Sequence, residues 1–326
     1  MRMGWGLIRL GWALAAGVAP GLASAPEGED VVVLRNGSEL RGTVKDLRGR
    51  FLKMNVRVGE SDRAGKIERA VPLADVERVW FHERLAAMGP GDSDSLEGFW
   101  ESRRRYLAAP GSEAGEAGLL LARRLLDAKG VRTARRAEAI AREVSRQDPD
   151  AKRQQAAQCA MVEALVQQDL LDDAEKALTT AVDSSPALNA SGQLRRARST
   201  LAWARVLELE AEFPRWRDDP EVNERHMDWV DVALEGAIHP FLFDPDNIPA
   251  AAAGLEDAVC RLAHLGRKEE AAVYAEDLAR LYPDSPQAER TVEWRGEPPR
   301  EDTNDGEGVR EERENENESN RKGTQS

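Results

Sequence analysis

The chain has 326 residues; 32% of them are charged, 5% are aromatic, and the formal net charge is −13. Few aromatic residues and many charged ones favour stacked helices over a large β-core, and the length allows one or two domains. Residues 27–84 hold eleven acidic and twelve basic residues, while residues 85–296 carry a net charge of −11. Because phosphate contacts need Lys and Arg, the acidic part argues against a nucleic-acid ligand.

The N-terminus has the pattern of an export signal. Arg2 and Arg9 accompany a short apolar run over residues 11–22, and Ala23-Ser24-Ala25 matches a small-residue cleavage site. The run is short and interrupted by a proline, which disfavours a membrane span, although an uncleaved anchor is the alternative. We predict a signal peptide over residues 1–25 and an exported, periplasmic or cell-envelope protein with no stable membrane span after cleavage.

Residues 30–85 predict a small five-stranded β-barrel. Five β-rich runs, 31–35, 39–47, 51–58, 67–73 and 76–81, are separated by turn residues, and Asn36-Gly37 is a strong hairpin signal. Alternation along the strands predicts an inward face formed by six apolar residues. These are Leu40, Val44, Leu52, Met54, Val56 and Val58.

The same region resembles Sm-like and wider SH3-like small barrels. Leu34, Gly37 and Gly42 in LRNGSELRGTV follow the order of the first half of the Sm signature, and Met54-Asn55 matches its Met-Asn pair. The interval from Gly42 to Met54 is longer than in that family, and the second Sm motif is absent from residues 67–76. The resemblance therefore implies the fold without RNA binding.

The opposite face of this barrel is predicted to be basic. Arg41, Lys45, Lys53 and Arg57 alternate with the inward residues of the second and third strands. Such a face can attract an anionic envelope polymer or an acidic protein surface. An ordinary solvated strand face is the other interpretation.

Residues 86–96 predict a linker, and a helical pattern follows. The predicted helices span residues 100–108, 116–128, 134–147, 151–168, 172–183, 193–212, 221–237, 249–265 and 268–281. Residues 238–248 predict an aromatic loop that interrupts the helices. Residues 296–326 have almost no apolar residue and predict a disordered acidic tail.

Three helices share a spacing of twelve residues from an alanine to a proline. The pairs are Ala137 and Pro149, Ala174 and Pro186, and Ala271 and Pro283. A small residue lets paired helices approach closely, and the proline ends the unit. The blocks resemble tetratricopeptide repeats over residues 97–295, and the last unit is similar to those of periplasmic envelope proteins. This resemblance implies a TPR-like α-solenoid that binds other proteins.

The sequence offers little catalytic or metal chemistry. His82, His226, His239 and His264 are scattered, and no phosphate-binding loop, nucleophile motif or Cys-x-x-Cys occurs. Cys159 and Cys260 are interpreted as small buried residues without a disulfide. We therefore expect no enzymatic activity and no cofactor.

Three tryptophans lie in the less regular middle of the helical region. Trp203, Trp216 and Trp229 could line an aromatic peptide groove, because Trp is enriched at interface hot spots. Filling of gaps between imperfect repeats is the alternative. The sequence as a whole predicts a non-enzymatic exported scaffold for protein–protein interaction, and it does not identify the protein partner. Binding of an anionic envelope polymer by the barrel is the second possibility.

Overall fold

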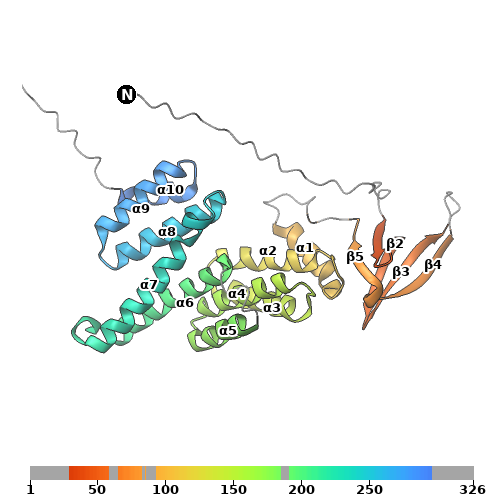
Figure 1. The fold of residues 1–326 in the computed structure, drawn as a ribbon, viewed down its shortest axis with the longest axis horizontal. Coiled ribbons are helices and arrows are strands. Elements are labelled where there is room, and N and C mark those ends of the chain that lie inside the picture. The colour runs from red at the N-terminus through yellow and green to blue at the C-terminus, as the bar shows by residue number, and fades with distance from the viewer. Residues whose placement is uncertain (1–28, 59–64, 83–84, 86–92, 185–190, 296–326) are drawn as a thin grey trace, which may run out of the picture. The chain divides into compact units, whose positions relative to one another are not determined.

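The computed structural model describes residues 29–58, 65–82, 85, 93–184 and 191–295. The predicted signal peptide and tail, residues 1–25 and 296–326, lie outside the described residues. The chain is mainly α, with helices that follow a five-stranded antiparallel sheet, as predicted (Figure 1). It divides into two compact units, residues 1–168 and residues 169–326.

The five predicted strands are all present within two residues of their expected bounds. They are β1 (Asp30–Leu34), β2 (Glu39–Arg48), β3 (Phe51–Val58), β4 (Gly65–Pro72) and β5 (Val76–Trp80). They form one antiparallel sheet in the order β4-β3-β2-β1-β5. A Cβ at Gly42 would lie 1.8 Å from the carbonyl oxygen of Asn55, so only glycine allows β2 to cross β3 this closely.

One core holds this sheet together. Buried residues come from every strand, including the edge strands β4 and β5, so the sheet curls around a shared interior. In the part of the chain that the structure describes, no hydrogen-bonded ladder joins β4 to β5. Leu40, Val44, Leu52 and Met54 are buried as predicted, and Val56 packs partly buried against them. Val58 is 50% exposed, contrary to expectation, because β3 runs past the end of the core.

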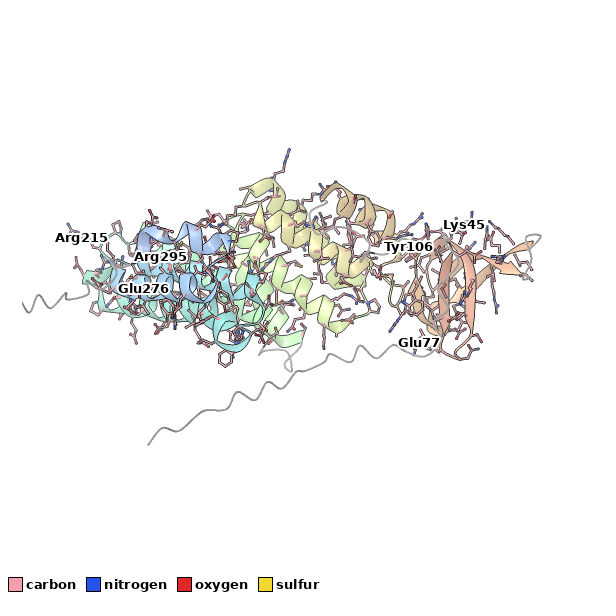
Figure 2. The ribbon with its side chains drawn as sticks, turned by 90° about the horizontal axis from the view of Figure 1, so that it is seen from above. Lys45, Glu77, Tyr106, Arg215, Glu276 and Arg295 are labelled. Atoms are coloured by element: carbon pink, nitrogen blue, oxygen red, sulfur yellow. The ribbon has the colours of Figure 1, made fainter. Side chains whose placement is uncertain are left out.

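The sheet core is completed from the helical side. Tyr106, in the short helix η3 (Arg104–Tyr106), lies against the sheet (Figure 2). Its ring is fully buried in this core, with its centroid 5.0 Å from that of the Phe81 ring. The backbone N–H of Val79 donates to the carbonyl of Pro110 at 2.9 Å. The predicted linker falls largely outside the described residues, so it stays a prediction.

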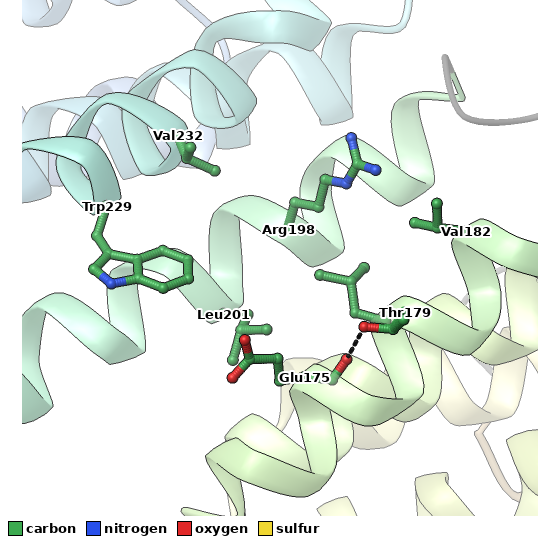
Figure 3. Close-up of a pocket in the computed structure, with 8 residues that line it drawn as sticks. Glu175, Thr179, Val182, Arg198, Leu201, Trp229 and Val232 are labelled. Atoms are coloured by element: carbon green, nitrogen blue, oxygen red, sulfur yellow. Dashed lines mark hydrogen bonds between the residues drawn. The ribbon is translucent and has the colours of Figure 1, made fainter. Parts of the chain in front are cut away.

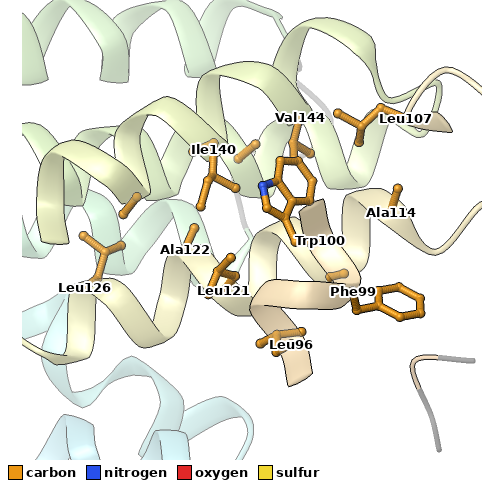
Figure 4. Close-up of a cluster of buried hydrophobic side chains, with 14 of the residues drawn as sticks. Leu96, Phe99, Trp100, Leu107, Ala114, Leu121, Ala122, Leu126, Ile140 and Val144 are labelled. Atoms are coloured by element: carbon orange, nitrogen blue, oxygen red, sulfur yellow. The ribbon is translucent and has the colours of Figure 1, made fainter. Parts of the chain in front are cut away.

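Four helices complete the first unit. They are α1 (Ser93–Arg103), α2 (Ala114–Asp127), α3 (Val131–Gln147) and α4 (Ala151–Val166). Helix α1 thus begins inside the stretch expected as linker. Trp100 is the centre of their apolar core (Figure 4). A Cβ at Gly118 would lie 2.5 Å from the Trp100 ring, so glycine lets α2 pack directly on the indole.

Six helices form the second unit in its described part. They are α5 (Leu171–Ser184), α6 (Gly192–Glu212), α7 (Pro220–Phe243), α8 (Ile248–His264), α9 (Lys268–Leu281) and α10 (Pro286–Arg290). Successive helices pack side by side from α5 to α10. None of the helices in the described ranges is both long and apolar enough to cross a membrane.

The aromatic loop predicted at residues 238–248 is wrong for most of its length. Helix α7 continues through Pro240 to Phe243. Proline removes one helical N–H, but the last turn of α7 still closes, because the N–H of Asp244 at the helix end donates to the carbonyl of Pro240. Ala237 is buried and Phe241 packs against buried residues of α8 and α9, so tertiary packing holds this end helical.

Small residues set the contacts between α6, α7 and α8. A Cβ at Gly236 would lie 2.5 Å from Ser199 Cβ, and one at Gly254 would lie 2.2 Å from the carbonyl oxygen of Ala237. The buried guanidinium of Arg261 donates from Nη1 to Ser199 Oγ at 2.6 Å and to the carbonyl of Ala233. Burial lowers the pKa of Arg261.

Candidate functional site

A shallow, mainly apolar groove lies between α5, α6 and α7 in the second unit (Figure 3). Its volume is roughly 320 Å³. It is lined by Glu175, Leu178, Thr179 and Val182 from α5, by Arg198 and Leu201 from α6, and by Trp229 and Val232 from α7. The exposed lining is mostly carbon.

Helical spacing explains why these side chains share one surface. On α5, residues 175, 178, 179 and 182 follow the i, i+3, i+4, i+7 pattern of one helix face. Ala174 and Ala181 on the adjoining face are fully buried. Leu201 is buried at the base of the groove, Trp229 is half-buried, and Val232 is 40% exposed. The groove therefore presents apolar area to solvent on a fixed helical frame.

The charged groups around this groove are unevenly arranged. Arg205 on α6 binds three carboxylates: Asp172 at 2.7 Å, Glu175 at 2.9 Å and Glu208 at 2.7 Å. Burial acts to lower the pKa of Arg205, but these hydrogen bonds outweigh it and hold that pKa above its usual range. The hydrogen bond from Arg205 lowers the pKa of Asp172. Arg198, in contrast, has no ion pair in the described part of the chain.

The groove presents mainly apolar side chains together with charged groups. Its lining includes no histidine or cysteine, and Glu175 is engaged with Arg205. Across the described ranges, no group of three or more His, Cys, Asp and Glu side chains is placed to hold a metal ion. An apolar surface flanked by charged groups fits a segment of another protein.

Of the three predicted tryptophans, the structure brings only Trp229 into the groove. Trp216 stacks on His226 with ring centroids 3.7 Å apart and planes 15° apart. Trp203 meets His264 edge-on at 5.3 Å. These two contacts match the packing interpretation of the sequence.

The two histidines share a carboxylate that sequence reasoning missed. His226 Nε2 lies 2.9 Å from Glu210 Oε1, and His264 Nε2 lies 2.7 Å from Glu210 Oε2. A carboxylate only accepts hydrogen bonds, so each Nε2–H donates. Burial acts to raise the pKa of Glu210, but the bonds from His264 and His226 lower it. The three residues come from different helices, and no local spacing could have revealed the cluster.

The predicted basic face is largely neutralised by carboxylates. Arg41 pairs with Glu39 at 2.9 Å, Lys53 with Glu68 at 3.8 Å and Arg57 with Glu29 at 3.3 Å. Lys45 lies at an irregularity of the β2–β3 pairing and is exposed (Figure 2). The four side chains therefore present less net positive charge than the sequence suggested.

The repeat-packing residues lie at the positions that the spacing predicts, where they are described. Ala137, Ala174 and Ala271 are fully buried on α3, α5 and α9. Pro149 and Pro283 follow the ends of α3 and α9. Pro186 lies outside the described residues.

Neither cysteine forms a disulfide in the described part of the chain. Cys159 is buried in α4, as predicted. Cys260 is exposed, so the expectation of a buried residue is wrong there. Its neighbour Val259 packs into the core. The apolar pattern of α8 does not show which of these two adjacent residues faces the core.

Comparison of this chain with protein-family models, with curated proteins and with solved structures found no match. A functional proposal therefore rests on the geometry and chemistry of the groove.

Proposed function

We propose that this protein is a non-enzymatic exported scaffold that binds a segment of another protein in the groove between α5, α6 and α7. The observation that carries the proposal is the exposed apolar lining around Trp229 and Val232. Exposed apolar surface in a concave site is costly unless a partner covers it. The tryptophan supplies the kind of large, rigid contact that dominates interface energies.

The helical region is proposed to be a TPR-like solenoid, and the sheet a Sm-like or SH3-like small barrel. The three fully buried alanines and the prolines after α3 and α9 support the first assignment. The single core shared by all five strands supports the second. Location in the periplasm or cell envelope rests on the predicted signal at residues 1–25.

The alternative proposal, binding of an anionic envelope polymer by the basic face, has weaker support. Three of its four cations already have carboxylate partners. A polymer would have to compete with these pairs, whereas the groove needs no side chain to be released.

Photo-crosslinking in the native cell tests the proposal. A photoreactive amino acid at Thr179, in the groove, is compared with one at Val273, which is 58% exposed on α9 outside the groove. We expect a discrete protein adduct from Thr179 and not from Val273, identified by mass spectrometry. No adduct from Thr179, or the same adducts from both positions, contradicts binding in the groove.

A further inference from the structure

The groove carries one cation that nothing in the described chain neutralises. Arg198 lines it on α6, half-buried, and its guanidinium has no carboxylate or hydrogen-bond partner among the described residues. Several arginines of the same unit pair with carboxylates, among them Arg195 with Glu235 at 2.7 Å, Arg267 with Glu270 at 2.6 Å and Arg290 with Glu256 at 2.5 Å. Residues 85–296 contain more acidic than basic side chains, so carboxylates are plentiful. Arg198 therefore offers an unpaired guanidinium beside the apolar side chains of the groove.

The charges give the groove two unlike ends. Arg198 lies on the side of the groove toward Val182, while Glu175 lies across the groove from it (Figure 3). Around Glu175, one cation, Arg205, is shared by three carboxylates, so that end is net negative. A carboxylate on a bound segment is attracted to the Arg198 end and repelled from the other.

Resting on the function proposed above, we infer that the partner is a protein segment with apolar side chains next to a carboxylate, and that Arg198 binds this carboxylate. The apolar side chains contact Leu178, Trp229 and Val232. A guanidinium beside an apolar surface forms a strong, directional pair with a carboxylate, because its donors match the two oxygens. The carboxylate is an acidic side chain of the partner.

Selection from a random peptide library displayed on phage, with the full chain as bait, tests this inference. We expect the selected peptides to share an acidic group next to apolar residues. Arg198→Gln should weaken their binding about tenfold or more, the loss of one charge-assisted hydrogen bond. Arg198→Lys should retain part of the affinity. Lys268→Gln, which removes an exposed cation on α9 outside the groove, should change nothing.

Trp229→Ala distinguishes failure of the carboxylate inference from failure of the groove as a binding site. Peptides that lose affinity with Trp229→Ala but keep it with Arg198→Gln overturn the carboxylate inference and leave the groove as the binding site. Peptides that are insensitive to Trp229→Ala, or a selection that yields none, count against the groove and hence against both. Unchanged thermal melting of each variant shows that losses of affinity do not come from unfolding.

Discussion

At the scale of single residues, Glu210 joins three helices by accepting from two histidines. His226 is fully buried, and its Nδ1 has no hydrogen-bond partner in the described part of the chain, so the ring is held by its Nε2 contact with Glu210. Removing the carboxylate would leave the buried Nε2–H of His226 without a charged acceptor, which costs stability. The cluster therefore links α6, α7 and α8 through side-chain hydrogen bonds.

Glu210→Gln tests the role of this cluster through the pH dependence of the unfolding free energy. The folded-state pKa of Glu210 lies below its ordinary value of 4.5, so its charge stabilises the fold above that value and the contribution is lost as the pH falls through the folded pKa. We expect the variant to lose about 1–3 kcal/mol of unfolding free energy near neutral pH, and less below 4.5.

Denaturant titrations across that pH range measure the difference. Glu212→Gln, an exposed residue on the same helix, is the matched control and should have little effect at any pH. A loss that is equal at all pH values would show that the charge of Glu210 plays no part.

At this scale the sequence predicts which side chains are buried better than which side chains meet. The sequence predicts that Trp229 either lines a groove or fills a gap between repeats, and the structure places it in the groove. The partners of Trp203 and Trp216 were missed, because their contacts with His264 and His226 depend on how separate helices pack. Periodicity predicts which face of a helix is buried, but not which residue of the next helix meets it.

At the scale of elements, close helix contacts depend on side chains that are small. Ala271 is fully buried on α9, whereas Val273, two residues away, is 58% exposed. Ala271→Trp should destabilise the chain by roughly 1–3 kcal/mol through overpacking. Val273→Trp should stay within about 0.5 kcal/mol, as surface substitutions do. Thermal melts of the full chain measure the difference between the two variants. Equal melting temperatures would mean that the α8–α9 contact has room for a large side chain at position 271.

Glycine has the same role between α7 and α8. Gly254→Ala places a Cβ 2.2 Å from a backbone carbonyl oxygen, which cannot move aside cheaply, so we expect a loss of roughly 1–3 kcal/mol. Gly192→Ala meets open space and should be neutral or stabilise by up to about 1 kcal/mol, the helix propensity difference. Chemical denaturation measures the change in unfolding free energy of each variant. Two variants of equal stability would indicate that α7 and α8 separate readily.

Strands and most helices follow from the sequence because their signals are local. The alternation in β2 and β3 and the turns around them specify the strand bounds. The end of α7 does not follow, because a proline and several aromatics predict a break that packing of Phe241 overrides. At the end of α7 the local sequence pattern predicts a loop, whereas the tertiary contacts of Phe241 keep the chain helical.

At the scale of the whole molecule, the groove belongs to the second compact unit, and export is proposed from residues 1–25. We expect the mature protein to begin near Ser24 or Pro26, because cleavage follows the small residues of Ala23-Ser24-Ala25. N-terminal sequencing of the protein from the native cell measures this. An intact Met1 on membrane-bound protein would contradict cleavage and identify the segment as an anchor.

The central claim is that the groove between α5, α6 and α7 binds a protein segment. Its most direct test is calorimetric titration of the partner found by crosslinking into the wild-type chain and two variants. Trp229→Ala should lower the affinity by about 30-fold, the loss of a hot-spot side chain worth about 2 kcal/mol. Val273→Ala, which also removes exposed apolar surface, should leave the affinity unchanged. Equal affinities for all three proteins would contradict the claim.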